Sequence, residues 1–371
     1  MKFAIIENEF GEVGVDEKII TESVDEEIIE VMNGCICCTV RGDLVEALKR
    51  LYQRVEKFDG VIIETTGLAD PAPVAQTFFV DETIPDMYRL DSIITVVDAC
   101  HIMGQLERER SEGAENEAEE QIAFADRVLL NKVDLVNDDS ALLDIEGKIR
   151  SINSSCRVLR CQLNNLESTT ADIITKYVLN LKAFELERVL EMEPDFLDSD
   201  TVDHVHDSTV SSVACRFEGE LNTFKLQRWI SELIGIPTEA ANLFRYKGIL
   251  AVKGKQEKFV FQGVHMVFSG HFSEAHQWED EGTKRECRFV FIGKNLDRDR
   301  LLSGFMNCKA EEVLRFNVGD PVQARSRTGW RDGVVIRQWD EGNCYRIQLV
   351  NCPDKTTVHA PIDDDLCVKG R

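Results

Sequence analysis

Three cysteines fall within four positions of the segment NGCICCTVRGDL, residues 33–44. In extended backbone Cys35 and Cys37 point to the same side, because side chains alternate, and Cys38 supplies a third thiolate after a turn. A nearby cation, Arg41, favours the thiolate form. Soft thiolates joined by a carboxylate or imidazole suit Zn²⁺ in tetrahedral geometry, so the spacing predicts a reversible zinc site. Co²⁺ and Ni²⁺ are compatible with the same donors.

Two other interpretations of these cysteines have to be weighed. The chain has 12 cysteines, but outside 35–38 they are scattered singly, and the N-terminal segment MKFAIIENEF lacks the layout of a secretory signal. A disulfide framework is therefore a poor interpretation, and Cys37 and Cys38 could pair only through a strained ring. Buried cysteines that fill a core are the second alternative.

An acidic loop lies upstream of the cysteines. The segment IENEFGEVGVD, residues 6–16, carries Glu7, Glu9, Glu12 and Asp16 around two glycines. Acidic loops are usually only solvated, but carboxylates near a cysteine-rich loop permit a mixed oxygen and sulfur metal site.

The segment LLNKVDL, residues 129–135, is the most specific short motif. A buried strand delivers Asn131, Lys132 and Asp134 to its carboxyl end, where open α/β sheets bind ligands. The Asp134 carboxylate can accept from N1–H and the exocyclic amine of guanine, and adenine lacks these two donors. Lys132 can lie along the base plane, and Asn131 can brace the loop. The motif predicts a guanine site, with a polar turn as the alternative.

A second strand end has the spacing of a nucleotide switch. In VIIETTGLADP, residues 61–71, Glu64 is followed by Thr65, Thr66 and Gly67. The carboxylate would reach Mg²⁺ through water or orient the attacking water, and the glycine N–H would approach the γ-phosphate. We expect Glu64 and Gly67 to serve hydrolysis and the two threonines to contact the nucleotide. A strand that ends in a capped turn is the alternative.

These motifs need a parallel sheet to position them. Apolar, β-branched runs at 2–7, 60–64, 92–98 and 127–131 are typical of strands buried on both faces, and they alternate with helix-period stretches at 43–57, 73–79, 115–125 and 141–153. The alternation predicts a doubly wound α/β domain with a mostly parallel sheet.

Three further segments follow this first domain, which we place at 1–192. Residues 193–210 are acidic and lack periodicity, which predicts a linker; 211–308 predict a small α+β domain; and 315–371 predict a small β-barrel of SH3 or Tudor type. The barrel carries Trp330, Trp339 and Tyr345, which either form an aromatic cage for a methylated side chain or fill a small core.

Composition excludes several classes of function. The formal net charge of −24 opposes general nucleic-acid binding, because a phosphate backbone would be repelled. No apolar run approaches the roughly 20 residues that span a bilayer. We therefore expect a cytoplasmic protein with neither nucleic-acid nor membrane partners, although an organelle address is not excluded by these residues.

Taken together, the segments resemble the CobW-type metallochaperone GTPases, and more narrowly their zinc-regulated branch. The resemblance rests on IENEFGEVGVDE, MNGCICCTVRGDL, ETTGLADPAPVAQTFF, VVDAC and LLNKVDL in this order, and it extends from residue 1 to about residue 308. It implies a P-loop GTPase-like fold with GTP, Mg²⁺ and Zn²⁺ as ligands. It also implies that Cys35, Cys37 and Cys38 form the metal motif and that Glu7 and Glu12 add carboxylate ligands.

One departure from the family is large. Members open with a strand and a glycine-rich loop that ends in Gly-Lys-Thr, and no G-x-x-x-x-G-K-[ST] occurs in this sequence. The resemblance places the missing strand at the centre of the sheet, so its absence should leave an apolar slot between neighbours. We expect an N-terminally truncated version of a complete GTPase, with a natural variant that binds nucleotide poorly as the alternative. The sequence as given should hydrolyse GTP poorly or not at all.

The resemblance implies a GTP-dependent zinc metallochaperone that delivers Zn²⁺ to a client metalloenzyme, with methionine aminopeptidase as the client of the zinc-regulated branch. GTP binding would order the switch loops around the metal loop, and hydrolysis would loosen the metal. Two alternatives stay open: a metal-binding paralogue without turnover, and an interaction adaptor that acts through the C-terminal barrel.

Overall fold

The computed structural model describes most of the chain. The described residues are 2–8, 28–30, 39–53, 58–67, 69–81, 83–108, 116–164, 176–183, 210–235, 242–278, 285–350 and 356–371, without the side chains of 7–8, 28–30, 39–43 and 274–276. The three clustered cysteines, Glu12 and the side chain of Glu7 therefore lie outside the description. The chain divides into two compact units, Met1–Arg188 and Val189–Arg371. Among the described helices, none combines the length and the apolar character needed to cross a membrane.

The first unit alternates strands and helices, as the sequence predicts. Its strands are β1 (Phe3–Asn8), β2 (Ile28–Glu30), β3 (Gly60–Thr65), β4 (Ile94–Asp98), β5 (Arg127–Asn131) and β6 (Arg157–Arg160). Its helices are α2 (Thr39–Tyr52), α3 (Ala72–Val80), α4 (Ile84–Met87), α5 (Ile102–Leu106), α6 (Glu117–Phe124), the 3₁₀ turn η2 (Val133–Leu135) and α7 (Asp139–Ile152).

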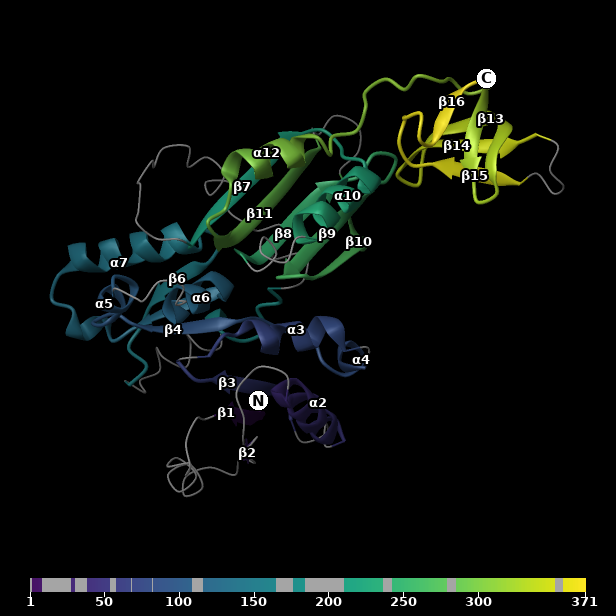
Figure 1. The fold of residues 1–371 in the computed structure, drawn as a ribbon. Coiled ribbons are helices and arrows are strands. Elements are labelled where there is room, and N and C mark those ends of the chain that lie inside the picture. The colour runs from purple at the N-terminus through teal and green to yellow at the C-terminus, as the bar shows by residue number, and fades with distance from the viewer. Residues whose placement is uncertain are drawn as a thin grey trace. The chain divides into compact units, whose positions relative to one another are not determined.

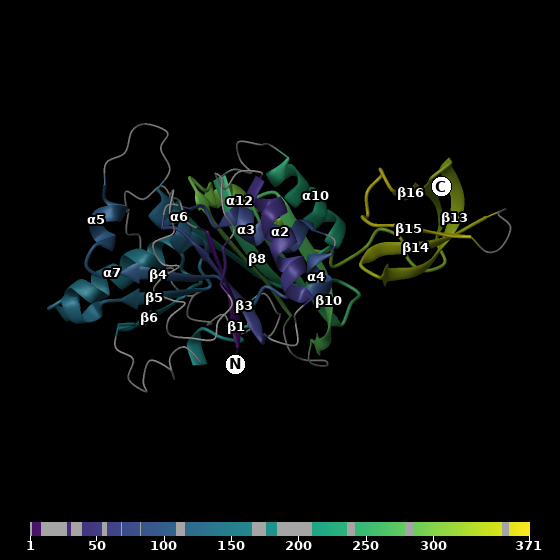
Figure 2. The same cartoon turned by 90° about the horizontal axis from the view of Figure 1, so that it is seen from below.

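The six strands described in this unit pair only in parallel, but they form two sheets. The strand orders are β2-β1-β3 and β4-β5-β6, and the described parts of β3 and β4 are not paired with one another (Figure 1, Figure 2). The parallel α/β architecture is thus confirmed, whereas the single doubly wound sheet is not seen. The missing central strand stays a prediction.

Two strands differ from the prediction that both faces are buried. Ile62 on β3 is 45% exposed and Val96 on β4 is 57% exposed, although their neighbours Ile63 and Val97 are at least partly covered. Isolated exposed apolar side chains are common, but these two stand on the strands that flank the break, so β3 and β4 are not buried on both faces along their whole length. The apolar run alone does not reveal this exposure.

Helix α2 covers the β2-β1-β3 sheet with an apolar stripe. Leu44, Ala47, Leu48 and Leu51 recur at helical spacing and are at most 3% exposed, and they pack with Ile6 of β1. Burying a leucine or isoleucine side chain contributes about 1.5–3 kcal/mol each, so this stripe fixes the helix on the sheet. The N-terminal end of α2, immediately after Cys38, is thereby tied to the strands.

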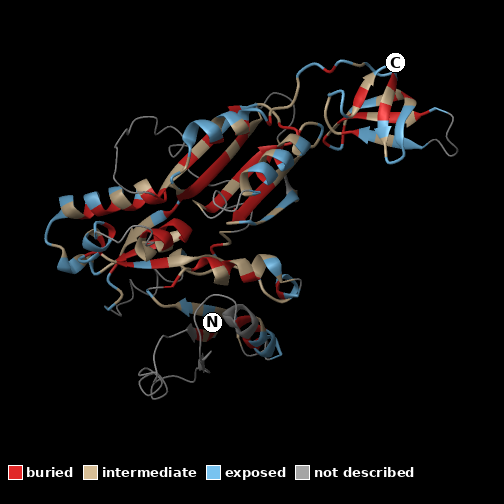
Figure 3. Ribbon diagram, viewed as in Figure 1, coloured by how far each residue is buried: buried red, intermediate tan, exposed pale blue. Residues whose placement is uncertain are grey.

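The second unit begins with an antiparallel sheet. Its strands are β7 (Val210–Glu218), β8 (Leu243–Ala251), β9 (Glu257–Val264), β10 (Val267–Gln277) and β11 (Glu286–Lys294), in the order β10-β9-β8-β11-β7, and its helices are α10 (Thr223–Ile234) and α12 (Arg298–Met306). Trp229 of α10 packs edge-on against Phe291 and near Phe305 of α12. Figure 3 shows the long buried stretches of β8 and β11 that this aromatic core produces.

A five-stranded antiparallel sheet ends the chain. It contains β12 (Pro321–Ser326), β13 (Gly329–Asp340), β14 (Asn343–Leu349), β15 (Thr357–Ala360) and β16 (Val368–Gly370), in the order β15-β14-β13-β12-β16. We call this segment, residues 315–371, the C-terminal module. Tyr345 is fully buried, and its hydroxyl oxygen accepts a hydrogen bond from the Phe316 N–H at 3.1 Å. Tyr345 therefore fills the core and is not available to an open aromatic cage.

Candidate nucleotide and metal site

The predicted guanine motif lies at the carboxyl edge of the β4-β5-β6 sheet. Asp98 ends β4 and Asn131 ends β5, and the two residues are paired in the strand register. The Ala99 N–H donates to the Asn131 carbonyl at 3.0 Å, which extends the ladder by one residue beyond the strands. Backbone hydrogen bonds between the two strands therefore fix the positions from which the Asp98 and Asn131 side chains project.

Lys132 follows directly and is bound by a neighbouring carboxylate. Its backbone is left-handed, with φ 61°, and its Nζ donates to Asp98 Oδ2 at 2.7 Å. His101 Nδ1 lies 3.1 Å from the same oxygen, and the Cys100 N–H donates to Oδ1 at 2.9 Å. The hydrogen bond from Lys132, followed by those from His101 and Cys100, lowers the pKa of Asp98 to about 2. Asp98 is thus a carboxylate at neutral pH that positions Lys132.

Asn131 braces the loop after β6, as the motif predicts. Its Oδ1 accepts a hydrogen bond from the Leu163 N–H at 2.8 Å, and the Cys161 thiol lies 4.0 Å from the same oxygen. The Cys161 N–H donates to the Leu130 carbonyl at 2.9 Å, which ties this loop to β5 as well. Burial raises the pKa of the Cys161 thiol, so this cysteine is protonated and structural.

Asp134 is the exposed member of the motif. It lies in the short turn η2, which is closed by the Leu135 N–H donating to the Lys132 carbonyl at 3.1 Å. An exposed carboxylate at a strand's carboxyl end can accept hydrogen bonds from a ligand without first losing a protein partner. The arrangement therefore suits recognition of the two donors on a guanine edge.

The predicted switch residues follow β3. Glu64 and Gly67 are exposed, and Thr65 is half-buried. The hydroxyl oxygen of Thr66 is buried without a hydrogen-bond partner among the described residues. An unpartnered buried hydroxyl is costly, so the Thr66 side chain is a candidate ligand contact.

Gln121 of α6 connects this switch to the guanine edge. Its Nε2 donates to the carbonyls of Thr66 at 3.2 Å and Ala69 at 2.9 Å. Its own carbonyl accepts from the Thr95 hydroxyl on β4 at 2.7 Å. One helical residue thus links the loop after β3 to the strand that ends in Asp98.

The acidic segment and the cysteine-rich segment both begin at the carboxyl edge of the β2-β1-β3 sheet. In the register of β1, β2 and β3, Glu7 is paired with both Glu30 and Glu64. Because the strands are parallel, the segments that follow all three residues start from one edge. Cys35, Cys37 and Cys38 lie between the end of β2 and the start of α2, but their own structure is outside the described residues, as is Glu12.

The sequence patterns do not single out every participant of the site. Asp98 occurs only within VVDAC, the Leu163 backbone N–H carries no side-chain pattern, and Gln121 and Glu30 belong to no motif. The signal that could have found Asp98 is its place at the end of a buried strand, which matches that of Asn131.

Comparisons with known proteins agree with this architecture. Residues 1–160 match the CobW/HypB/UreG nucleotide-binding domain, and residues 210–309 match the cobalamin synthesis protein cobW C-terminal domain. The chain is 33% identical over 309 residues to the zinc chaperone YjiA of Escherichia coli, which covers 82% of this chain and 89% of that protein. The chain belongs to the CobW family.

Other CobW relatives carry related descriptions. The zinc-regulated GTPase metalloprotein activator 1 of Schizosaccharomyces pombe is 29% identical over 298 residues, covering 72% of this chain and 69% of that protein. The crystal structure of Zn(II)-bound YjiA GTPase from E. coli has a TM-score of 0.63 and 27% identity, covering 83% of this chain and 90% of that chain. A Zn(II)-bound triple mutant of YjiA, with one glutamate and two adjacent cysteines replaced by alanine, has the same TM-score at 26% identity.

Proposed function

We propose that this CobW protein is a GTP-dependent zinc metallochaperone. It would bind Zn²⁺ through Cys35, Cys37 and Cys38 and release it to a client metalloenzyme according to its nucleotide state. The proposal rests on one relationship: the paired positions Glu7, Glu30 and Glu64 lie at the edge from which the cysteine segment and the switch loop both depart.

The metal set is supported by donor chemistry and by a relative. Thiolates with one or two carboxylates are a suitable set for Zn²⁺, and Glu7 and Glu12 are the candidate carboxylates. Replacement of a glutamate and two adjacent cysteines in the YjiA variant concerns the same residue types. That variant still contains zinc, so measured affinity, rather than the presence of metal, is the informative quantity.

The residues of the nucleotide edge fit GTP. Asp134 would accept from the guanine edge, Lys132 would lie along the base, and Asn131 would hold the adjoining loop, as it does in this structure through Leu163. The unpartnered hydroxyl of Thr66 suits a phosphate oxygen or a Mg²⁺-bound water. When bound, Mg²⁺ neutralises charge on the phosphates; Glu64 would hold a water, and the Gly67 N–H would face the phosphate.

Coupling between the two ligands follows from the shared edge. A phosphate that orders the loop after Glu64 changes the surroundings of Glu7, which is paired with Glu64 in the sheet. This change alters whether the Glu7 carboxylate can coordinate the metal. Loss of that phosphate reverses the change. In thermodynamic terms the nucleotide alters zinc affinity, and zinc must alter nucleotide affinity by the same factor.

The test is a zinc titration against a chromophoric chelator, with and without a non-hydrolysable GTP analogue. The Cys35→Ser/Cys37→Ser/Cys38→Ser variant should bind zinc at least about a hundredfold more weakly, because the loss of thiolate ligands removes several kcal/mol of binding free energy. A Cys100→Ser/Cys367→Ser variant, which changes an exposed and a half-buried thiol elsewhere, should keep the parental affinity.

Two results would contradict the proposal. If the triple serine variant holds zinc as tightly as the parent, the cysteines are not the ligands. If the analogue binds but leaves zinc affinity unchanged, the protein binds both ligands without coupling and is not a nucleotide-controlled chaperone.

A second function, zinc binding without GTP turnover, is favoured by the break between the two sheets. β3 and β4 are unpaired with each other within the described residues, and Ile62 and Val96 are exposed on them. Measuring phosphate release from GTP distinguishes the two functions. GTP hydrolysis by this chain would exclude zinc binding without turnover, whereas zinc binding with no hydrolysis would support it.

A further inference from the structure

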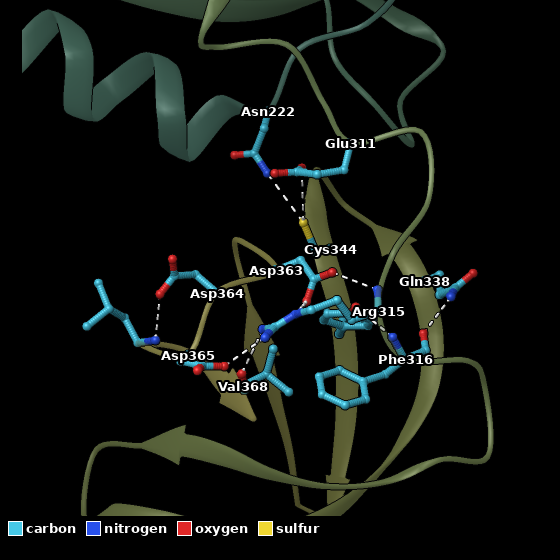
Figure 4. A network of polar contacts seen from close by, with 12 residues as sticks. Asn222, Glu311, Arg315, Phe316, Gln338, Cys344, Asp363, Asp364, Asp365 and Val368 are labelled. Carbon is cyan, nitrogen blue, oxygen red and sulfur yellow. Dashed lines mark hydrogen bonds and ion pairs between the residues drawn. The ribbon is translucent and has the colours of Figure 1, made fainter. Parts of the chain in front are cut away.

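One end of the C-terminal module is fixed to the preceding antiparallel domain through Asn222. This residue is fully buried and caps α10, since its Oδ1 accepts from the N–H groups of Phe224 and Lys225. Its Nδ2 donates to the Pro361 carbonyl at 2.7 Å. The same nitrogen lies 3.6 Å from the Cys344 sulfur (Figure 4), and both Pro361 and Cys344 belong to the module. One side chain therefore joins the two parts without a spare donor or acceptor.

The β13–β14 turn adds close backbone contacts. A Cβ atom on Gly254, in the turn before β9, would lie 2.3 Å from the Trp339 carbonyl oxygen. A Cβ atom on Gly342 would lie 3.2 Å from Thr223 Oγ1. Both glycines have positive φ, so two positions accept only glycine where the module meets the domain. The module is docked by this turn and is not a freely tethered unit.

The incoming segment is fastened as well. Arg315 donates to Asp363 Oδ1 at 2.8 Å, to Asp365 Oδ1 at 2.7 Å and to the Val368 carbonyl at 3.1 Å (Figure 4). Lys225 of α10 contacts Glu311 Oε1 at 2.6 Å. The connection between the domain and the module is thus held by ion pairs at both of its ends.

Strand β13 carries the chain from the docked turn to the opposite end of the module. It has 12 residues, from Gly329 to Asp340. At roughly 3.3 Å per residue its two ends are about 36 Å apart. The turn at the far end is ordered, because the Ser326 hydroxyl donates to the Gly329 carbonyl at 2.7 Å and accepts from the Thr328 N–H at 3.3 Å. We call residues 325–331 the distal turn.

The distal turn carries cations that the described protein does not neutralise. Arg325, Arg327 and Arg331 are exposed, and none of the three makes a side-chain hydrogen bond or ion pair to a described residue. Between them Trp330 is 37% exposed, and Lys369 Nζ lies 4.5 Å from the centre of its ring. In the strand register Arg325 is paired with Trp330 and Arg331 with Ala324, so Arg325 shares the face of Trp330 and Arg331 lies on the other face. Exposed guanidinium groups and an aromatic ring on one turn form a surface suited to carboxylates and an apolar side chain.

This charge contrasts with the remainder of the chain. Residues 315–371 contain nine basic and eight acidic side chains, whereas the other residues contain 34 basic and 59 acidic side chains. The distal turn lies several Debye lengths, each about 8 Å at physiological salt, from the docked end. Its positive potential is therefore little reduced by acidic groups beyond the module.

We propose that the distal turn, with Lys369, is a docking site for an acidic peptide segment of a partner protein. The arginines pair with its carboxylates, and Trp330 packs against a side chain between them. Docking at the other end of the module gives the partner a defined position relative to the antiparallel domain. The proposal is independent of the metal and nucleotide ligands.

Charge favours this occupant over two others. A long polyanion such as RNA reaches beyond the turn into the field of a chain with net charge −24, and it is repelled there. A second copy of the chain carries the same net charge, so two copies repel each other as they approach. A short acidic segment interacts only within the screened surroundings of the turn.

Fluorescence anisotropy of the full chain tests the proposal. The probe is a short labelled peptide of alternating glutamate and glycine, with the matching lysine peptide and a labelled oligouridylate as comparisons. The Arg325→Glu/Arg327→Glu/Arg331→Glu variant should bind the acidic peptide at least about tenfold more weakly, because three exposed ion pairs are reversed. Trp330→Ala should also weaken binding. The matched variant Lys294→Glu/Arg298→Glu/Arg300→Glu has the same change in net charge and should bind like the parent.

Several outcomes would overturn the proposal. The first is that the parent shows no measurable binding of the acidic peptide. The second is that the matched variant loses as much affinity for the peptide as the distal-turn variant. The third is that the distal-turn variant binds the peptide as tightly as the parent and has an unchanged thermal melt. Tighter binding of oligouridylate than of the peptide would assign the surface to nucleic acid. Arginine-dependent self-association in sedimentation would assign it to a second copy.

Discussion

The ammonium group of Lys132 donates a 2.7 Å hydrogen bond to the carboxylate of Asp98, which ends the neighbouring parallel strand. The two residues are 34 positions apart in the chain. The sequence motif names Lys132 as a base contact, whereas the carboxylate that orients it comes from another strand. This relationship gives the predicted guanine site a preorganised cation.

Replacing Asp98 with asparagine should remove a pH-dependent part of the stability. The folded-state pKa of about 2 lies below the ordinary value of 3.8, so the carboxylate's contribution is complete above that ordinary value and is lost as the pH falls toward 2. Because Lys132 is 49% exposed, the difference at pH 7 should be at most about 1 kcal/mol. Urea unfolding between pH 2 and pH 7 measures it. Lys132→Met, which removes the donor and keeps the carboxylate, should diminish the same trend.

Asn131→Ala should weaken both the loop and guanine recognition. The Leu163 N–H would lose its 2.8 Å acceptor, which should cost about 1–2 kcal/mol of unfolding free energy if the group stays half-buried. Urea unfolding gives the stability, and hydrogen exchange at Leu163 reports the loop directly. Unchanged exchange at that amide would show that solvent replaces the side chain without cost.

Gly254→Ala should destabilise the second unit more than Gly329→Ala. Both glycines have positive φ, 81° and 110°, so both substitutions strain the backbone. Only at Gly254 would the added Cβ meet another atom, the Trp339 carbonyl oxygen at 2.3 Å, whereas nothing lies within 4 Å at Gly329. The difference in thermal unfolding should be at least about 1 kcal/mol. Equal destabilisation by the two substitutions would mean that the turn next to Gly254 moves to admit the Cβ atom at no cost in free energy.

Thiol reactivity should separate buried from exposed cysteines. Burial raises the pKa of Cys215, Cys287, Cys308 and Cys344 to about 12, and these thiols are at most 1% exposed. A disulfide reagent at pH 8 should therefore label exposed Cys100 rapidly and these four only after unfolding. Mass spectrometry of the labelled peptides reads each site. Rapid labelling of Cys344 would contradict the docked arrangement at Asn222.

Much of the local structure could be predicted from the sequence. The strand expected at 127–131 is observed at those residues, and the helix expected at 141–153 is observed at Asp139–Ile152 with Asp138 as its cap. Such elements follow from apolar periodicity and capping chemistry, which are local properties. Strand pairing depends on residues far away, so the break between β3 and β4 and the exposure of Val96 could not be read from an apolar run.

The candidate site divides in the same way. Asn131, Lys132 and Asp134 could be named because a contiguous motif carries them, whereas Asp98 and the Leu163 N–H enter only through the register and the loop after β6. The C-terminal module gives a further example, since Tyr345 stands in sequence like a cage residue and is buried in the core. Whether Tyr345 is buried or exposed depends on which face of β14 is turned toward the core of the module.

The sequence by itself determined the kinds of donor available: clustered thiolates, strand-ending carboxylates and a guanine motif, because residue type and short spacing set chemistry. Only the tertiary structure decided which of these groups adjoin, pairing Glu7 with Glu64, Asp98 with Lys132 and Asn222 with Pro361. The physical reason is that hydrogen bonds and ion pairs act over a few ångströms of space, and chain folding alone brings distant residues within that range.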